Sequence, residues 1–225
     1  MKLPISSSRA RTIAGFAIFA GLGLFLLALM ACLKVPVGNP EESRIDPALS
    51  GVWRVENMVE SSAALWIIEP WDARTWILTT LSAKEDESTD DAAATTPGDV
   101  LTQIESRGLE SVDNYKAWLA TFSGVRFIVL EPKKALRDLA GEKPEFWFVF
   151  KVKKPTADRV ELFLVEGKQI LNAETTSEAE RILRKRARDP ALYGNGSDSV
   201  ILSRVPVSEY SRVEELLESL NISTQ

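Results

Sequence analysis

The chain of 225 residues has 27 basic and 32 acidic side chains, a net charge of −5, and 45% hydrophobic residues. This composition is typical of a globular protein, and the acidic balance argues against general nucleic-acid binding, which depends on neutralising phosphates. The sequence has no histidine and one cysteine, which excludes histidine-based triads, histidine-ligated zinc and an internal disulfide. We therefore expect no nucleic-acid partner, no metal and no cofactor.

The N-terminus has the pattern of an export signal. Lys2, Arg9 and Arg11 precede an uncharged, mostly apolar stretch over residues 12–33. Positive charges followed by an apolar run direct export, with the N-terminus left inside. The run is also long enough to span a bilayer as a helix. A cleaved signal peptide over residues 1–31 and an uncleaved single-pass anchor are therefore both open.

The one cysteine lies at the end of this run, in the stretch Leu29-Met30-Ala31-Cys32. The stretch resembles the lipobox of bacterial lipoproteins, in which Leu and a small residue precede an obligatory Cys; Met30 departs from the usual Ala or Ser. The resemblance implies signal cleavage guided by Leu29 and Ala31, a lipid on Cys32, and a protein held at the membrane and facing the periplasm. Leu33, in place of an Asp, favours the outer membrane over the inner one.

After the cysteine, residues 32–48 are polar and contain three prolines, so we expect them to form a tether between the lipid and one domain over residues 49–225. In this domain alternating or continuous apolar residues predict an early meander of strands at 51–56, 63–69 and 75–81. Residues 83–99 contain six acids, one lysine and no large apolar residue. We expect this segment to be a disordered acidic loop.

Three later segments have helical patterns. Residues 111–122 place four apolar side chains at i, i+3, i+4 and i+7. A second helix is expected to begin in residues 175–189, where Ser177 can form a capping box with Glu180. A third is expected over residues 208–220.

Further strands are predicted at 125–131 and 198–205, with a hairpin over 145–168. About seven mostly antiparallel strands and three helices predict an α+β fold: a curved antiparallel sheet or half-open barrel with the helices packed on it.

The stretch Gly51-Val52-Trp53 is similar to the G-x-W that opens the first strand of lipocalins. The resemblance implies a barrel-shaped cup that carries an apolar ligand, although the two helices expected between the strands depart from the lipocalin pattern. Trp53, Trp66 and Phe148 are the candidate cavity residues. The alternative is that these aromatic side chains fill a core.

One face of the second expected helix is basic. The residues at i, i+3, i+4 and i+7 are Arg181, Arg184, Lys185 and Arg188. On a membrane-anchored protein such a stripe could contact lipid phosphates. Acidic residues one turn earlier favour instead a solvated face stabilised by ion pairs.

No pattern points to catalysis. Glu69, Glu131 and Glu166 each end an apolar strand, where burial could raise a carboxyl pKa, but nothing places two of them opposite one another. We therefore expect a non-enzymatic envelope lipoprotein with a binding or structural role. Its partners would be the membrane, through the lipid on Cys32, and either an apolar ligand or another envelope protein.

Overall fold

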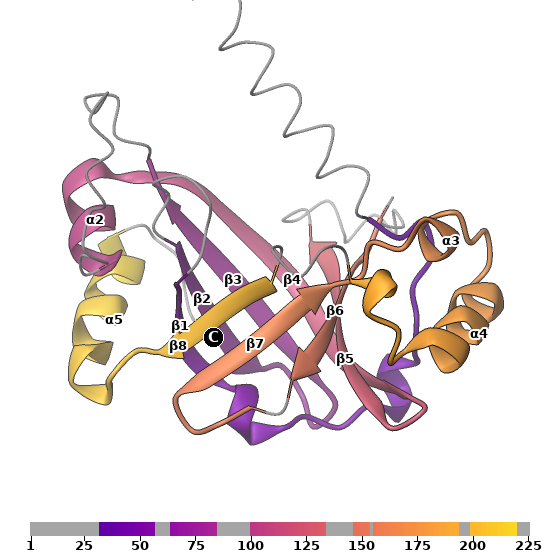
Figure 1. Cartoon of the computed structure of the whole chain (residues 1–225). Coiled ribbons are helices and arrows are strands. Elements are labelled where there is room, and N and C mark those ends of the chain that lie inside the picture. The colour runs from indigo at the N-terminus through magenta and orange to yellow at the C-terminus, as the bar shows by residue number, and fades with distance from the viewer. Residues whose placement is uncertain are drawn as a thin grey trace, which may run out of the picture.

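The computed structural model describes residues 32–56, 64–84, 100–133, 146–153, 155–193 and 199–219. Within them, eight antiparallel strands follow one another around a closed barrel, and the last strand pairs with the first (Figure 1). The strands are β1 Gly51–Val55, β2 Ala64–Pro70, β3 Thr75–Ala83, β4 Leu109–Phe122, β5 Val125–Lys133, β6 Phe148–Lys153, β7 Arg159–Leu164 and β8 Ser199–Arg204. The expected barrel-like α+β fold is confirmed, but the barrel is closed and has eight strands, not seven.

The additional strand is β4, which replaces the helix expected over residues 111–122. β4 pairs along its length with β3 and β5, and its side chains alternate: Tyr115 and Ala117 face the barrel interior, whereas Trp118 packs outside it. The hairpin to β5 turns on Ser123 and Gly124, with φ of 51° and 76°. Two consecutive positive φ angles suit a tight hairpin between twisted strands, so this turn favours a strand pair over a helix that ends here.

Four α-helices in the described part of the chain cover the barrel from outside: α2 Val100–Arg107, α3 Lys168–Leu171, α4 Thr176–Arg186 and α5 Tyr210–Ser219. α2 and α5 lie together on one flank, and α3 and α4 on another (Figure 1). The helices α4 and α5 were expected, but the N-cap of α4 is Thr175, whose side chain accepts the Glu178 N–H, and not Ser177. α2 was not expected. In the segment expected to be an acidic loop, Ala83 is a buried residue of β3, and residues 85–99 lie outside the described residues.

The two ends of the barrel differ. The connections β2–β3, β4–β5 and β6–β7 are short and lie at one end, which we call the closed end. A short 3-10 helix, η2 Pro47–Leu49, precedes β1 at this end. The connections β1–β2, β3–β4, β5–β6 and β7–β8 are longer and leave the opposite end, which we call the long-connection end.

Residues 32–48 do not form the expected tether. Leu33 pairs with Trp147, the residue before β6, through two backbone hydrogen bonds of 2.9 Å. Leu33 and Val37 are both 0% exposed, and the Val37 carbonyl accepts the Trp118 Nε1–H at 3.0 Å. Because Leu33 and Val37 are buried against the barrel, this segment is part of the folded domain.

Candidate functional site

The closed end is sealed by the first and last strands. Trp53 is fully buried and its Nε1–H donates to the Leu49 carbonyl at 2.9 Å. The Arg204 guanidinium of β8 lies over the Trp53 ring, 4.1 Å from its centroid, and donates to the carbonyls of Ala48 and Ser50 at 2.9 and 2.8 Å. Trp53, expected to line a cavity, is therefore part of a packed seal.

The glycine of the G-x-W stretch has a steric role in this seal. Gly51 has a φ of +128°, which residues with a side chain rarely adopt, and a Cβ at this position would collide with the Arg204 guanidinium. A glycine at position 51 therefore leaves room for the Arg204 guanidinium at the start of β1. Its partner Arg204 was not identified from the sequence, because only the closure of β8 on β1 brings the two together.

The middle of the barrel is filled by aromatic contact. Trp66 on β2 and Phe150 on β6 face inward from opposite walls, and their rings meet edge to face with centroids 6.3 Å apart. Trp76 and Ile128 are also buried in the barrel interior. The contact between Trp66 and Phe150 therefore leaves little space for a ligand in the middle of the described barrel.

A pocket of about 380 Å³ lies at the long-connection end. Its apolar wall is made by Tyr115, Phe146 and Phe148, with ring centroids 6.1 Å apart for Tyr115 and Phe148 and 5.5 Å apart for Phe146 and Phe148. The remaining lining residues are Val112, Asp113, Asn114, Pro132 and Lys133. Burial raises the pKa of Tyr115 to about 12, with smaller contributions from the negative charges of Asp113 and Cys32. Of the three expected cavity residues, Phe148 lines this pocket; Trp66 is half-buried in the barrel core, across from Phe150.

Cys32 lies beside this aromatic pocket. The residue after it, Leu33, is paired with Trp147 between the two phenylalanines. The Cys32 thiol is half-buried, and burial raises its pKa to about 11. Such a thiol is a weak nucleophile at neutral pH.

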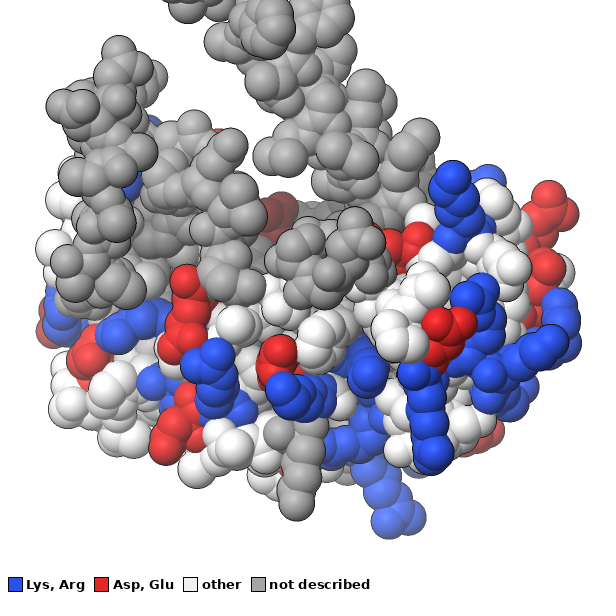
Figure 2. All heavy atoms as spheres, viewed as in Figure 1, with Lys and Arg blue, Asp and Glu red and all other residues white. Residues whose placement is uncertain are grey.

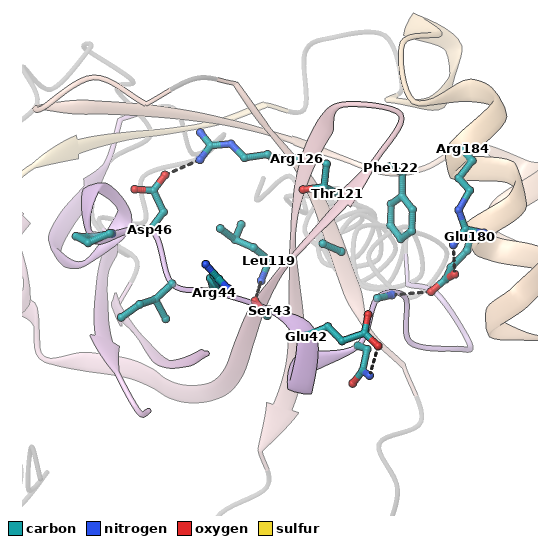
Figure 3. A pocket seen from close by; sticks show the side chains of 15 residues that line it. Glu42, Ser43, Arg44, Asp46, Leu119, Thr121, Phe122, Arg126, Glu180 and Arg184 are labelled. Atoms are coloured by element: carbon teal, nitrogen blue, oxygen red, sulfur yellow. Dashed lines mark hydrogen bonds and ion pairs between the residues drawn. The ribbon is translucent and has the colours of Figure 1, made fainter. Parts of the chain in front are cut away.

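A larger cleft of about 790 Å³ lies between residues 38–47, the β4–β5 hairpin and α4 (Figure 3). Its polar groups bind one another. Asp46 forms an ion pair with Arg126, Glu180 accepts from Arg184 and from the Gly38 N–H, and other close contacts tie residues 39–43 to each other and to β4. The cleft is therefore best understood as the seam that fastens the N-terminal segment to the barrel.

The basic stripe of α4 lies near the closed end. The Arg184 guanidinium is 5.5 Å from the centroid of the Phe122 ring, and Arg188 donates to the Ser123 carbonyl at 3.5 Å, both at the β4–β5 turn. Arg181 and Lys185 line a shallow pocket with the acidic Glu178 and Asp189. Figure 2 shows the basic side chains gathered around α4, with acidic ones between them. The stripe is thus at the opposite end of the barrel from Cys32.

The three glutamates considered for catalysis do not form a site. Glu69 is exposed at the closed end of β2, Glu131 on β5 forms an ion pair with Lys133, and none of the three lines any of the pockets described above. In the described ranges no cluster of acidic or cysteine side chains is arranged to hold a metal ion. The helices found among the described residues are all too short or too polar to cross a membrane.

No family model, curated protein or solved structure matches this chain. The class is therefore defined by architecture alone: an eight-stranded up-and-down barrel, sealed at one end, of a size that holds its own side chains or one small ligand.

Proposed function

We propose that this chain is an exported, lipid-anchored envelope protein with a non-catalytic role, and that its barrel binds a small apolar ligand at the long-connection end. The observation that carries the proposal is the aromatic pocket of Tyr115, Phe146 and Phe148 at the open side of a sealed barrel. The lipobox-like stretch before Cys32 supports the anchor.

The shape of the pocket limits the ligand. Its volume of about 380 Å³ lies within the range of small-molecule sites. Aromatic walls favour an apolar chain or ring, while Asn114 and Lys133 at the side of the pocket could orient one polar group. A single acyl chain end or a small ring system fits this description better than a bulky lipid.

The non-catalytic part of the proposal rests on the side chains that are present. The sequence has no histidine, Glu69 and Glu131 lie on different strands, and the raised pKa of Cys32 disfavours a thiolate. These features give little support to an acid–base pair or an activated nucleophile.

A second candidate is a structural or interaction module, in which the pocket holds no ligand. The filled interior around Trp53, Trp66 and Phe150 favours it, because little space is left for cargo. An uncleaved N-terminal helix in place of the lipid remains an alternative form of the anchor, and would leave the barrel and its pocket unchanged.

Ligand binding can be tested by titration with the fluorescent apolar probe N-phenyl-1-naphthylamine. We expect saturable binding to the wild-type protein and at least about tenfold weaker binding to Phe146→Asp. A carboxylate in the apolar wall of the pocket disfavours binding of an apolar probe, and a tenfold increase in Kd corresponds to about 1.4 kcal/mol of binding free energy. Trp71→Asp is the matched control, because Trp71 is exposed at the closed end and should not affect binding. Equal binding by both variants, or none by the wild type, would favour the structural module.

A further inference from the structure

We infer that the long-connection end of the barrel rests on the lipid bilayer, so that the pocket of Tyr115, Phe146 and Phe148 faces the membrane. The inference rests on the proposed lipid at Cys32 and specifies which surface of the domain the anchor presents to the bilayer.

Cys32 is attached rigidly to the barrel. A free tether over residues 32–48 could extend about 55 Å at roughly 3.3 Å per residue, and would let the barrel rotate freely. In the structure Leu33 is instead fixed to Trp147 by two hydrogen bonds of 2.9 Å and is 0% exposed. A lipid on Cys32 is therefore one residue, or about 3.8 Å along the chain, from the barrel wall. Insertion of the lipid brings this end to the membrane surface.

The chemistry of the described surface around Cys32 also supports the inference. Tyr115, Phe146 and Phe148 are only half-buried, and Val112 is 37% exposed at the edge of the same pocket. Aromatic rings with a polar edge are favoured at the bilayer interface.

The closed end is a poor alternative membrane surface. Its exposed large apolar side chains are Trp71, at 64%, and Val207, at 76%, which follows the end of β8 by three residues. Charged residues surround Trp71, because Asp72 follows it in the turn and the ion pair between Arg74 and Glu41 lies at the same turn. Single apolar side chains scattered among charges do not form a contiguous patch for insertion.

The orientation can be tested on the full-length lipidated protein in vesicles of phosphatidylethanolamine and phosphatidylglycerol. The variants Val112→Cys and Trp71→Cys each add one thiol at an exposed site, and the lipid on Cys32 keeps that residue from being labelled. Each variant is labelled with bimane, and quenching is measured with nitroxide-headgroup lipids and with iodide in the water. Both sites are exposed, so the substitutions should not affect folding.

We expect the headgroup nitroxide to quench the label at position 112 at least threefold more than the label at 71, and iodide to show the reverse preference. Equal quenching at the two sites, or stronger lipid quenching at 71, would overturn the inference. A mass spectrum of the same sample separates the two proposals: if Cys32 carries no lipid, the anchor itself is wrong, whereas a lipidated protein with the wrong quenching pattern refutes only the orientation.

Discussion

Replacing Arg204 by methionine tests whether the barrel is sealed in the way described. The substitution keeps an unbranched apolar side chain over Trp53 but removes the guanidinium. Three hydrogen bonds are lost, from Nε to the Ala157 carbonyl at 2.6 Å and from the two terminal nitrogens to Ser50 and Ala48 at 2.8 and 2.9 Å. The stacking on the Trp53 ring at 4.1 Å is lost as well.

The expected destabilisation follows from these contacts. A hydrogen bond to a charged group contributes about 1.5–3 kcal/mol when buried, and a cation–π contact about 0.5–2 kcal/mol. Arg204 is only half-buried, and contacts that share one side chain are not additive. We therefore expect Arg204→Met to lower the free energy of unfolding by roughly 3 kcal/mol, a large part of the 5–15 kcal/mol typical of a domain. Arg204→Lys keeps the charge but not the fork of donors, and should lose about 2 kcal/mol.

The assay is urea unfolding followed by tryptophan fluorescence. Arg159→Met is the matched control, because Arg159 lies on the neighbouring strand β7 and its ion pair with Glu56 is exposed on both sides. We expect the control to lose less than about 1 kcal/mol. If Arg204→Met unfolds within about 0.5 kcal/mol of the control, the guanidinium does not hold the closed end together and the reasoning fails.

Three further predictions concern the N-terminal segment and the buried ionisable groups. Leu33→Ala should lower the free energy of unfolding by about 2–4 kcal/mol because Leu33 is fully buried. Lys34→Ala, at an exposed position, should lower it by less than about 0.5 kcal/mol in the same urea assay. Equal losses for the two variants would show that residues 32–48 are a free tether. Burial raises the pKa of Tyr115 and Tyr193 to about 12 from an ordinary 10.0; since the fold favours the neutral phenols, stability should be fully present below pH 10 and decline between pH 10 and 12. Absorbance at 295 nm should show two late tyrosine titrations, and ordinary midpoints for both would contradict the burial. In the non-lipidated protein, burial raises the Cys32 pKa to about 11, so alkylation by iodoacetamide should be slow at pH 8 and rise about tenfold per pH unit until about pH 11; a plateau near pH 9 would show an exposed thiol.

Local patterns predicted most of the strands, and the reason for the main failure is physical. In residues 111–122 the apolar side chains fit helical spacing, yet the second half of β4 has buried residues on both faces, with Ala117 inside the barrel and Trp118, Ala120 and Phe122 in the outer cluster shared with the N-terminal segment and α4. A strand covered on both faces has no clean alternation. The Ser123-Gly124 turn was the available signal, because a two-residue turn with positive φ angles joins strands.

The candidate site was predictable only in part. Phe148 was expected and lines the pocket, but Tyr115 was assigned to a helix and therefore missed. The burial of Leu33 and Val37 could not be foreseen either, since single apolar residues in a proline-containing segment look the same in a free tether and in a segment packed on a barrel. Such long-range pairing depends on contacts with residues more than 80 positions away, such as Trp118 and Trp147.

A native mass spectrum of the protein, extracted gently from its own membrane, tests most directly whether the barrel carries both a lipid on Cys32 and a bound ligand. We expect a chain that begins at Cys32 with acyl chains attached, together with a small apolar molecule that leaves on activation. A chain that begins at Met1 without added lipid would contradict the anchor, and a lipidated chain that carries no molecule would contradict the ligand.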